Sequence, residues 1–234
     1  NPTAKTEEFE VDLTPPSVAL RTNPRIISPN GDGRQDKLSI YQETSVEEVW
    51  NGKITDGEGN LVRGITWRGA ADPAFDWDGL NQSGEVAPNG VYTYTLSCRD
   101  RAGNYAEAKS EPIRVDLRDT PVRLSIEGSA FSPNSDGQKD TITLIPNITD
   151  KSGVDRVSIT FFDSTGTSVR VLTADEAVEE FSWDGKSSTG RKVPDGSYSA
   201  EMVAEYANGN APKAKAEPII VDTRFPSLKV SVSN

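Results

Sequence analysis

Hydrophobic and polar residues alternate along several short stretches of this chain. The clearest lies at residues 91–98, where Tyr92, Tyr94, Leu96 and Cys98 are separated by threonine and serine. A period of two places alternate side chains on opposite faces of a β-strand. Residues 154–162 are rich in β-branched and aromatic residues, which also favours a strand. The weakly helical stretch at 173–180 is too short to form a stable element, and we expect a turn there.

Turn residues divide these stretches into hairpins. Residues 154–162 are followed by Asp-Ser-Thr-Gly at 163–166 and then by a returning strand at 167–172. A counterpart runs over residues 49–63, with its turn at 56–60. Short strands at intervals of about 8–12 residues, separated by Gly, Pro, Asn and Asp, are typical of a β-sandwich.

Much of this pattern occurs twice. Residues 27–33 return at 131–137, and Ser28 and Ser132 are 104 residues apart. Trp-Asp-Gly at 77–79 returns at 183–185, an offset of 106 residues. Solenoid repeats have periods of roughly 20–50 residues, whereas a whole sandwich domain has about 100. The sequence therefore predicts an all-β chain of two tandem immunoglobulin-like β-sandwiches.

The edges of the repeat occur a third time. Residues 4–12 resemble 108–116 and 214–222, and each of these segments is followed by a proline-containing junction. We therefore predict that residues 1–13 are the last strand of a preceding module and residues 224–234 the first strand of a following one. The complete modules are predicted at 14–117 and 118–223. Proline fixes φ, so the junctions should act as semi-rigid spacers.

The net charge of −11 changes the range of expected partners. An acidic chain is poorly suited to bind nucleic acid or an anionic membrane, because both carry negative charge. No apolar run of about 18 residues is present, so we expect no membrane insertion by this segment. The charge suits an exported protein, or one that collects cations.

The chain contains no histidine and a single cysteine, Cys98. A histidine-activated serine nucleophile and a Cys/His zinc site are therefore both excluded. One cysteine forms no intrachain disulfide, and its place in an alternating run predicts a small buried strand residue. We expect no enzyme activity from this segment.

One repeated loop has the residue types of a metal site. It reads Ser-Pro-Asn-Gly-Asp-Gly-Arg-Gln-Asp at 28–36 and Ser-Pro-Asn-Ser-Asp-Gly-Gln-Lys-Asp at 132–140. Calcium prefers six to eight oxygen ligands, and Asn and Asp at alternate positions resemble the first half of an EF-hand loop. The alternative is an Asx-turn, in which these side chains bond the local backbone and Gly33 or Gly137 adopts a positive φ. The candidate calcium ligands are Asn30, Asp32, Asp36, Asn134, Asp136 and Asp140.

Two repeated aromatic positions also carry alternatives. Trp77 and Trp183 precede Asp-Gly and could stack on a sugar ring, although a core tryptophan with a turn behind it is the more economical interpretation. Tyr92 and Tyr198 are expected to pack near a corner of the sandwich.

The second module combines Phe-Asp-Ser-Thr-Gly at 162–166, Val-Arg at 169–170, Trp-Asp-Gly at 183–185, Gly190, and Pro-Asp-Gly-Ser-Tyr at 194–198. In this combination it resembles the immunoglobulin-like domain of the flagellar hook-capping protein FlgD. The turn Asp-Arg-Ala-Gly-Asn at 100–104 looks like that of bacterial Ig-like repeats, although the second copy departs from it. These resemblances imply an exported bacterial protein of the periplasm, outer envelope or cell surface, built from stacked Ig-like modules. No flagellar role is carried over, because nothing here resembles the hook-binding part.

These features favour a non-catalytic spacer whose partners are neighbouring modules of the same chain. A finer form of this hypothesis is that calcium bound in the repeated loops stiffens the spacer. The alternative is an adhesin-type module that binds a protein or a glycan. An adhesin requires an exposed apolar or aromatic patch on one module. We expect it where the copies differ most, at residues 43–45 and 147–153.

Overall fold

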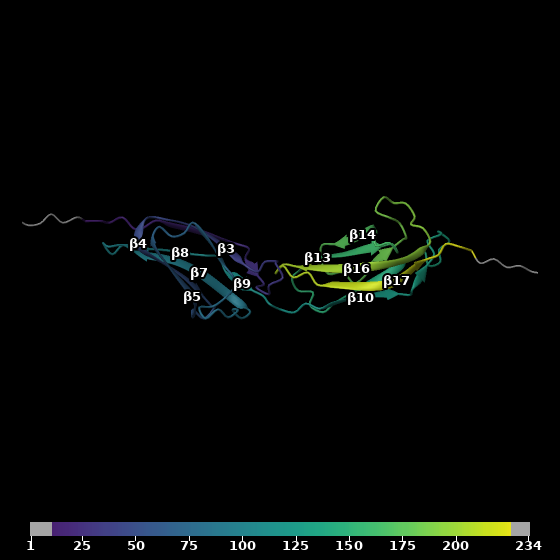
Figure 1. The fold of residues 1–234 in the computed structure, drawn as a ribbon, viewed down its shortest axis with the longest axis horizontal. Coiled ribbons are helices and arrows are strands. Elements are labelled where there is room, and N and C mark those ends of the chain that lie inside the picture. The colour runs from purple at the N-terminus through teal and green to yellow at the C-terminus, as the bar shows by residue number, and fades with distance from the viewer. Residues whose placement is uncertain (1–10, 226–234) are drawn as a thin grey trace, which may run out of the picture. The chain divides into compact units, whose positions relative to one another are not determined.

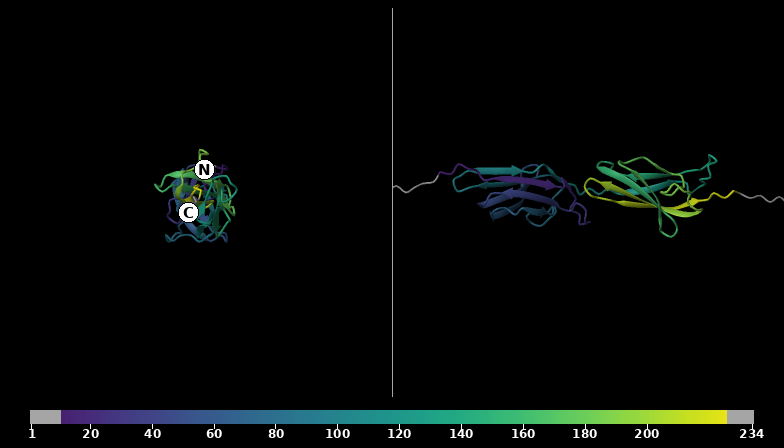
Figure 2. Two further views of the ribbon diagram at one scale, coloured as in Figure 1. Left: turned by 90° about the vertical axis from the view of Figure 1, so that its right-hand side faces the viewer. Right: turned by 90° about the horizontal axis from the view of Figure 1, so that it is seen from above.

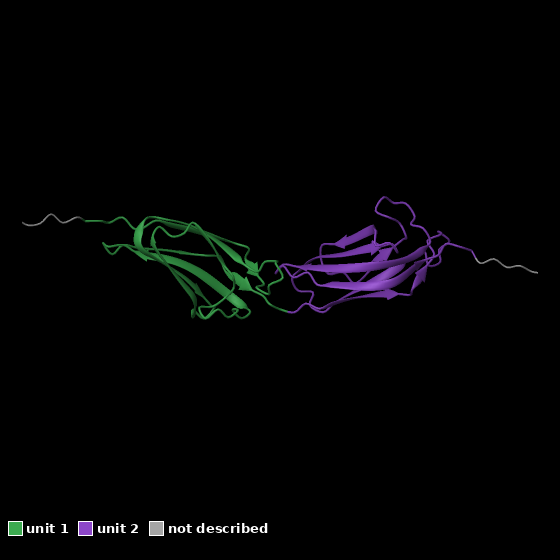
Figure 3. Cartoon of the chain, viewed as in Figure 1, with its two compact units in different colours: residues 1–118 green, residues 119–234 purple. Residues whose placement is uncertain are grey.

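The computed structural model describes residues 11–225, which divide into two compact units, Asn1–Arg118 and Asp119–Asn234 (Figure 3). The described residues form strands, turns and loops and contain no helix, so no helix there could cross a membrane. The all-β prediction is confirmed. The predicted strands of neighbouring modules lie outside the described residues, apart from 11–13 and 224–225, which are not in strands.

Each unit is a sandwich of two sheets (Figures 1 and 2). In unit 1 the smaller sheet has the order β1-β3-β6 and the larger the order β2-β9-β7-β4-β5, with β8 paired to β7. The bounds are β1 Val18–Asn23, β2 Ile26–Ile27, β3 Leu38–Thr44, β4 Glu47–Thr55, β5 Leu61–Gly69, β6 Ala74–Trp77, β7 Gly90–Arg99, β8 Tyr105–Lys109 and β9 Ile113–Val115.

Unit 2 repeats this topology. Its sheets have the orders β10-β12-β15 and β11-β17-β16-β13-β14. The bounds are β10 Val122–Glu127, β11 Ala130–Phe131, β12 Ile142–Ile148, β13 Val154–Phe162, β14 Ser168–Ala174, β15 Phe181–Trp183, β16 Gly196–Tyr206 and β17 Lys213–Val221. The single strand β17 occupies the position of both β8 and β9. The one strand expected at 108–116 is therefore two strands in unit 1.

Both predicted hairpins are present, as β4–β5 and β13–β14. The longer loop of the second copy is shorter than expected. Residues 146–148 belong to β12, where Pro146 faces Leu124 across the ladder, and only residues 149–153 form the connection. After β14 ends at Ala174, residues 175–180 form no helix.

One five-residue turn occurs six times within residues 11–225. In each, the first N–H bonds the fifth carbonyl, and the N–H of a glycine at the fourth position bonds the first carbonyl. That glycine has a positive φ, which is the requirement of a three-residue hairpin loop closed by a G1 bulge. The turns are 56–60, 81–85, 100–104, 163–167, 187–191 and 206–210.

The cores lie between the sheets and are filled differently in the two units. Gly52 of β4 leaves room for two rings, since an added Cβ would lie 2.7 Å from the Tyr94 hydroxyl and 2.8 Å from the Trp67 ring. At the corresponding positions of unit 2, Ile159 is paired with Met202, and Ala200 replaces the tyrosine. Side-chain volume is thus redistributed between adjacent strands, as close packing requires.

We expect Gly52→Ala to destabilise unit 1 by about 1–3 kcal/mol, because the buried Tyr94 ring and the half-buried Trp67 ring would have to shift. Urea denaturation measures the change. Gly64→Ala on the exposed face of β5 is the control, because its nearest contact would be at 4.0 Å, and we expect a change within about 0.5 kcal/mol. Equal effects at the two positions would contradict this account of the core.

Candidate functional site

The predicted metal loop lies between β2 and β3 in unit 1 and folds around its last aspartate. Asp36 accepts the N–H of Gly31 at Oδ1 (2.8 Å) and the N–H of Gly33 at Oδ2 (2.7 Å). Asn30 Oδ1 accepts the N–H of Asp32 at 3.0 Å, and Asp32 Oδ1 accepts the N–H of Arg34 at 2.8 Å. These are successive Asx-turns within one loop.

The loop of unit 2 has the same bonds. Asp140 accepts the N–H groups of Ser135 (2.6 Å) and Gly137 (2.8 Å), and Asn134 Oδ1 accepts that of Asp136 (3.0 Å). The Asn134 amide donates to Asp136 Oδ2 at 2.9 Å; this bond, together with the bond from the Gln138 N–H, holds the Asp136 pKa below its ordinary value. Gly137 has a φ of 86°.

The structure therefore brings together all three predicted residues of each loop and confirms the Asx-turn alternative. Both carboxylate oxygens of the last aspartate already accept backbone N–H groups, so the turn accounts for these residue types without a metal. Calcium binding stays a prediction. Residues 11–225 contain no group of three or more His, Cys, Asp and Glu side chains arranged to hold a metal ion.

This loop packs on the Trp-Asp-Gly turn of its own unit. A Cβ at Gly79 would lie 2.5 Å from Pro29 Cγ, and one at Gly185 would lie 2.6 Å from Pro133 Cγ. Both glycines also have a positive φ, 72° and 69°. Only glycine meets both conditions, so the two most recognisable repeated motifs are halves of one contact.

The tryptophans of these turns are buried. Trp77 and Trp183 are each 1% exposed, and their Nε1–H groups donate to the carbonyls of Leu80 and Lys186 at 2.9 Å. A buried ring offers no face to a sugar, so the structure confirms the packing interpretation and contradicts the sugar platform. Phe161 stacks on Trp183 with ring centroids 4.3 Å apart.

Tyr92 and Tyr198 form the predicted corners. Each hydroxyl donates to the carbonyl four residues upstream, of Pro88 and Pro194, at 2.7 Å. The rings lie beside Trp77 and Trp183, at centroid distances of 5.4 and 5.5 Å. Burial raises the pKa of both phenols, and the nearby Asp56 and Asp163 carboxylates add to the effect.

Cys98 is buried in β7, as predicted. Burial, followed by the charges of Glu47 and Asp100, raises the pKa of its thiol. A thiol held in its protonated form is a poor nucleophile.

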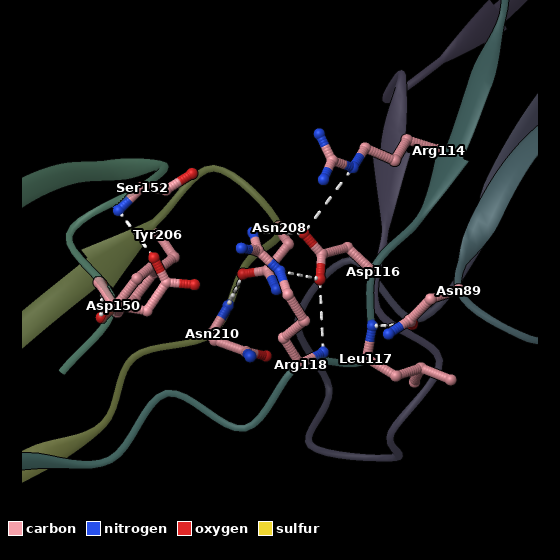
Figure 4. A network of polar contacts seen from close by, with 10 residues as sticks. All are labelled: Asn89, Arg114, Asp116, Leu117, Arg118, Asp150, Ser152, Tyr206, Asn208 and Asn210. Atoms are coloured by element: carbon pink, nitrogen blue, oxygen red, sulfur yellow. Dashed lines mark hydrogen bonds and ion pairs between the residues drawn. The ribbon is translucent and has the colours of Figure 1, made fainter.

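Sequence reasoning missed the segment by which the chain leaves each unit. In unit 1, Arg118 donates through Nε and Nη2 to the two oxygens of Asp116, at 2.8 and 2.7 Å, and the N–H of Leu117 donates to Asn89 at 2.6 Å (Figure 4). Arg114 lies 3.8 Å from the same carboxylate. We call the pair Asp116 and Arg118 the exit fork.

Unit 2 has its own exit fork. Arg224 donates through Nε and Nη2 to Asp222, both at 2.9 Å, and the N–H of Thr223 donates to Asp195 Oδ1 at 3.0 Å. The hydrogen bond from Arg224 lowers the Asp222 pKa to about 2. The fork therefore stabilises the folded unit at pH values above about 3.8, the ordinary pKa of an aspartate in the unfolded chain. That contribution is lost as the pH falls towards 2. The signal in the sequence was Asp-x-Arg at both module ends.

At the opposite end of the strands, the 100–104 and 206–210 turns differ. In unit 1 the Asn104 amide donates to the carbonyls of Asp12 and Thr14, at 3.1 and 3.4 Å, and so fastens the entering chain. In unit 2 the Tyr206 hydroxyl donates to the Asp150 carbonyl at 2.7 Å and ties its turn to the longer loop (Figure 4). The sequence difference between the 100–104 and 206–210 turns thus corresponds to a different hydrogen-bond partner in each unit.

Two shallow grooves are lined by the segments that were expected to carry a distinctive surface. Glu43 borders one of about 300 Å³ in unit 1, together with Tyr41 and Pro73. The Arg21 guanidinium lies 4.1 Å over the Tyr41 ring and covers its face. Residues 147–149 border a groove of about 520 Å³ in unit 2 whose lining has no aromatic residue. The adhesin hypothesis, which requires an exposed apolar or aromatic patch, stays a prediction, because the groove of unit 2 has no aromatic residue and that of unit 1 has one, Tyr41.

Comparison with known proteins gave matches in both units. The family model described as the FlgD Ig-like domain matches residues 25–101 and 129–208, together more than half of the chain. No curated protein matched at a significant level.

Solved structures with similar folds include a tetra-tandem repeat from the extending region of a large adhesion protein, with 24% identity over 89% of this chain and a TM-score of 0.39. The chain spans 50% of that structure. Fibronectin(III)-like modules of Clostridium thermocellum CbhA have 15% identity over 92% of this chain and 100% of theirs, with a TM-score of 0.47. A bacterial ice-binding adhesin has 11% identity over 91% of this chain and 67% of its own, with a TM-score of 0.42.

We expect Gly185→Ala to destabilise unit 2 by about 2–4 kcal/mol, because it adds a clash with Pro133 to the strain of a positive φ. Thermal and urea melts measure this. Gly190→Ala is the matched control, since it has a φ of 78° and nothing within 4 Å of the added Cβ. It should lose only about 1 kcal/mol. Equal losses would show that the proline contact contributes little.

Proposed function

This chain belongs to the FlgD Ig-like domain family through both of its units, and we propose that it is a non-catalytic, load-bearing spacer in an exported bacterial envelope or surface protein. The observation that carries the proposal is a short parallel pairing between the second strand and the last strand of each unit.

In unit 1, β2 pairs with β9 in parallel. The N–H of Arg114 donates to the Arg25 carbonyl at 2.8 Å, and that of Asp116 to the Ile27 carbonyl at 2.9 Å. In unit 2, β11 pairs with β17 in the same way, through Ile220 to Ser129 at 2.8 Å and Asp222 to Phe131 at 3.2 Å.

Parallel pairing determines how a pulling force is carried. β2 and β11 are pulled, through the strand that precedes each of them, towards the end where the chain enters, and the last strand is pulled towards the end where it leaves. The hydrogen bonds between them are then loaded together, in shear. An antiparallel pair loaded in the same way would instead open one bond at a time. Cooperative loading of bonds that are individually worth only about 1 kcal/mol suits a segment under tension.

The exit fork supports the same role. Asp116 is 4% exposed, and the two-pronged contact from Arg118 has the geometry of the stronger charge-assisted hydrogen bonds. With Leu117 also bonded, three successive residues after β9 have fixed positions on their own unit. A leaving segment that is ordered in this way transmits force into the sheet without first extending slack chain.

We expect the full chain, pulled by its termini in single-molecule force spectroscopy, to unfold in two separate events of about 100 residues each. Arg114→Pro removes one N–H of the parallel pair in unit 1 and should lower the force of one event only. Unit 2, in the same molecule, is the internal reference.

Gly52→Ala controls for simple loss of stability, because it perturbs the core and leaves β2 and β9 untouched. At a matched loss of melting temperature, Arg114→Pro should reduce the unfolding force more than Gly52→Ala. Unfolding without discrete force peaks in the wild-type chain would contradict the load-bearing proposal.

Calcium stiffening is a finer version of this proposal, and the loops do not require it. We expect the melting midpoints in EDTA and in 10 mM Ca²⁺ to agree, because the candidate carboxylates already bond the backbone. A site with a dissociation constant of ~10⁻⁴–10⁻³ M would instead add ~1.4–2.7 kcal/mol at 10 mM Ca²⁺. Such a rise, if lost in Asp136→Ala, would show that the loop of unit 2 binds calcium.

A further inference from the structure

One hairpin of unit 2 breaks a rule that its counterpart in unit 1 obeys. Lys186 and Lys192 face each other across an isolated antiparallel bridge, where unit 1 places Leu80 opposite Val86. Like charges directly opposite on paired strands are destabilising. The turn between them is the same five-residue turn in both units. The backbone therefore does not require lysine at these positions.

The two ammonium groups are held apart by different partners. Lys186 Nζ lies 2.6 Å from Asp184 Oδ2, so this lysine is neutralised by an ion pair. Lys192 Nζ donates to the Pro133 carbonyl at 2.7 Å, which orients the group and leaves its charge uncompensated. Both side chains belong to exposed residues.

Two arginines add to this charge. Arg191 is exposed, next to Lys192. Arg170 of β14 donates from Nη1 to the Ser187 carbonyl at 3.3 Å, so its guanidinium lies against the hairpin. We call Arg170, Lys186, Arg191 and Lys192 the cationic hairpin. Together with Asp184, which is ion-paired to Lys186, these side chains carry a charge of about +3 by formal count.

The equivalent hairpin of unit 1 has the opposite sign. Arg63 lies 3.3 Å from Asp78 and is neutralised by it, while Glu85 occupies the position of Arg191. Leu80 and Val86 contribute no charge. Two copies of one backbone thus differ in charge by about four units, in a chain whose net charge is −11. Solubility does not explain a cationic patch there, because the chain already carries a large net charge of the other sign.

The hairpin also presents hydroxyl groups between its cations. The Ser187 and Thr189 hydroxyl oxygens lie 2.9 Å apart at the tip. Hydroxyls and guanidinium groups together can hydrogen-bond carboxylate or sulfate oxygens, and the fork of Arg191 suits a planar carboxylate.

We propose that the cationic hairpin of unit 2 binds an anionic polysaccharide, a flexible chain that carries carboxylate or sulfate groups. The hairpin is short, so its partner must place a few separated negative charges on a small area. The rest of the chain is acidic, so the partner must also avoid wider contact with it. A stiff duplex or a flat anionic membrane would also meet the rest of a chain whose net charge is −11. The spacer role does not depend on this contact, because the parallel pairs lie in other strands.

The test uses the full chain with polygalacturonate and dextran sulfate as probes and neutral dextran as the blank, measured by biolayer interferometry. We expect binding to both charged polymers and none to dextran. Raising NaCl from 50 to 300 mM should weaken binding roughly 40- to 130-fold for about three ionic contacts.

The two units supply matched variants. Arg191→Glu combined with Lys192→Val gives unit 2 the residues of unit 1 and should reduce affinity at least tenfold. Glu85→Arg combined with Val86→Lys in the wild-type chain makes a second cationic hairpin and should raise the affinity. Arg191→Ala, which removes an exposed side chain, covers the case in which the double variant of unit 2 fails to fold; it should weaken binding about threefold or more.

Unchanged affinity in the folded unit 2 variants would overturn the proposal. Equal affinity for duplex DNA or for anionic phosphatidylserine vesicles would also overturn it, because the patch would then have no preference for a polysaccharide. Failure of the wild-type chain to bind either charged polymer would do the same, and would leave the force measurement on the spacer role unaffected.

Discussion

The contact between a loop proline and the glycine of the Trp-Asp-Gly turn organises one end of each sandwich. Pro29 on Gly79, and Pro133 on Gly185, leave no room for a Cβ. The turn places the tryptophan in the core with its Nε1–H bonded, and the corner tyrosine packs beside it. The loop then bends back from the proline. The Asx-turns of Asn30 and Asp32 supply hydrogen-bond acceptors for backbone N–H groups in this bend. A single steric condition therefore explains why these motifs recur together.

Much of the fold could be predicted because its signals are local. Alternation identified β7 and β13, turn residues identified both hairpins, and the repeat gave the number of units. The misses arose where tertiary context decides. Residues 146–148 looked like a loop because of Pro146 and Asn147, yet β10 offers them a ladder. The split of one expected strand into β8 and β9 depends on how each half meets β7, and no local pattern encodes that.

The candidate site was predicted less well, for a related reason. Asn30, Asp32 and Asp36 were grouped correctly, but a ligand set and an Asx-turn use the same residue types. What separates them is the direction of the carboxylates, and Asp36 directs both oxygens at the loop's own N–H groups. The exit fork was missed because Asp116 and Arg118 are two residues apart on a segment without regular structure. Such a pair meets only when the backbone turns, and the sequence pattern does not show that.

Repetition separates the demands of the fold from those of function. Features present in both units, such as the proline contact, the corner tyrosine, the parallel pair of second and last strands and the exit fork, are explained by the stability of each sandwich and by the way the chain enters and leaves it. A feature that opposes local stability in one unit alone needs another explanation. The Lys186–Lys192 bridge is such a feature, since the same backbone in unit 1 holds an apolar pair. The repulsion between the two ammonium groups is offset only in part, by the Asp184 carboxylate at Lys186 and the Pro133 carbonyl at Lys192. The charge that remains faces solvent, where an anionic partner can reach it.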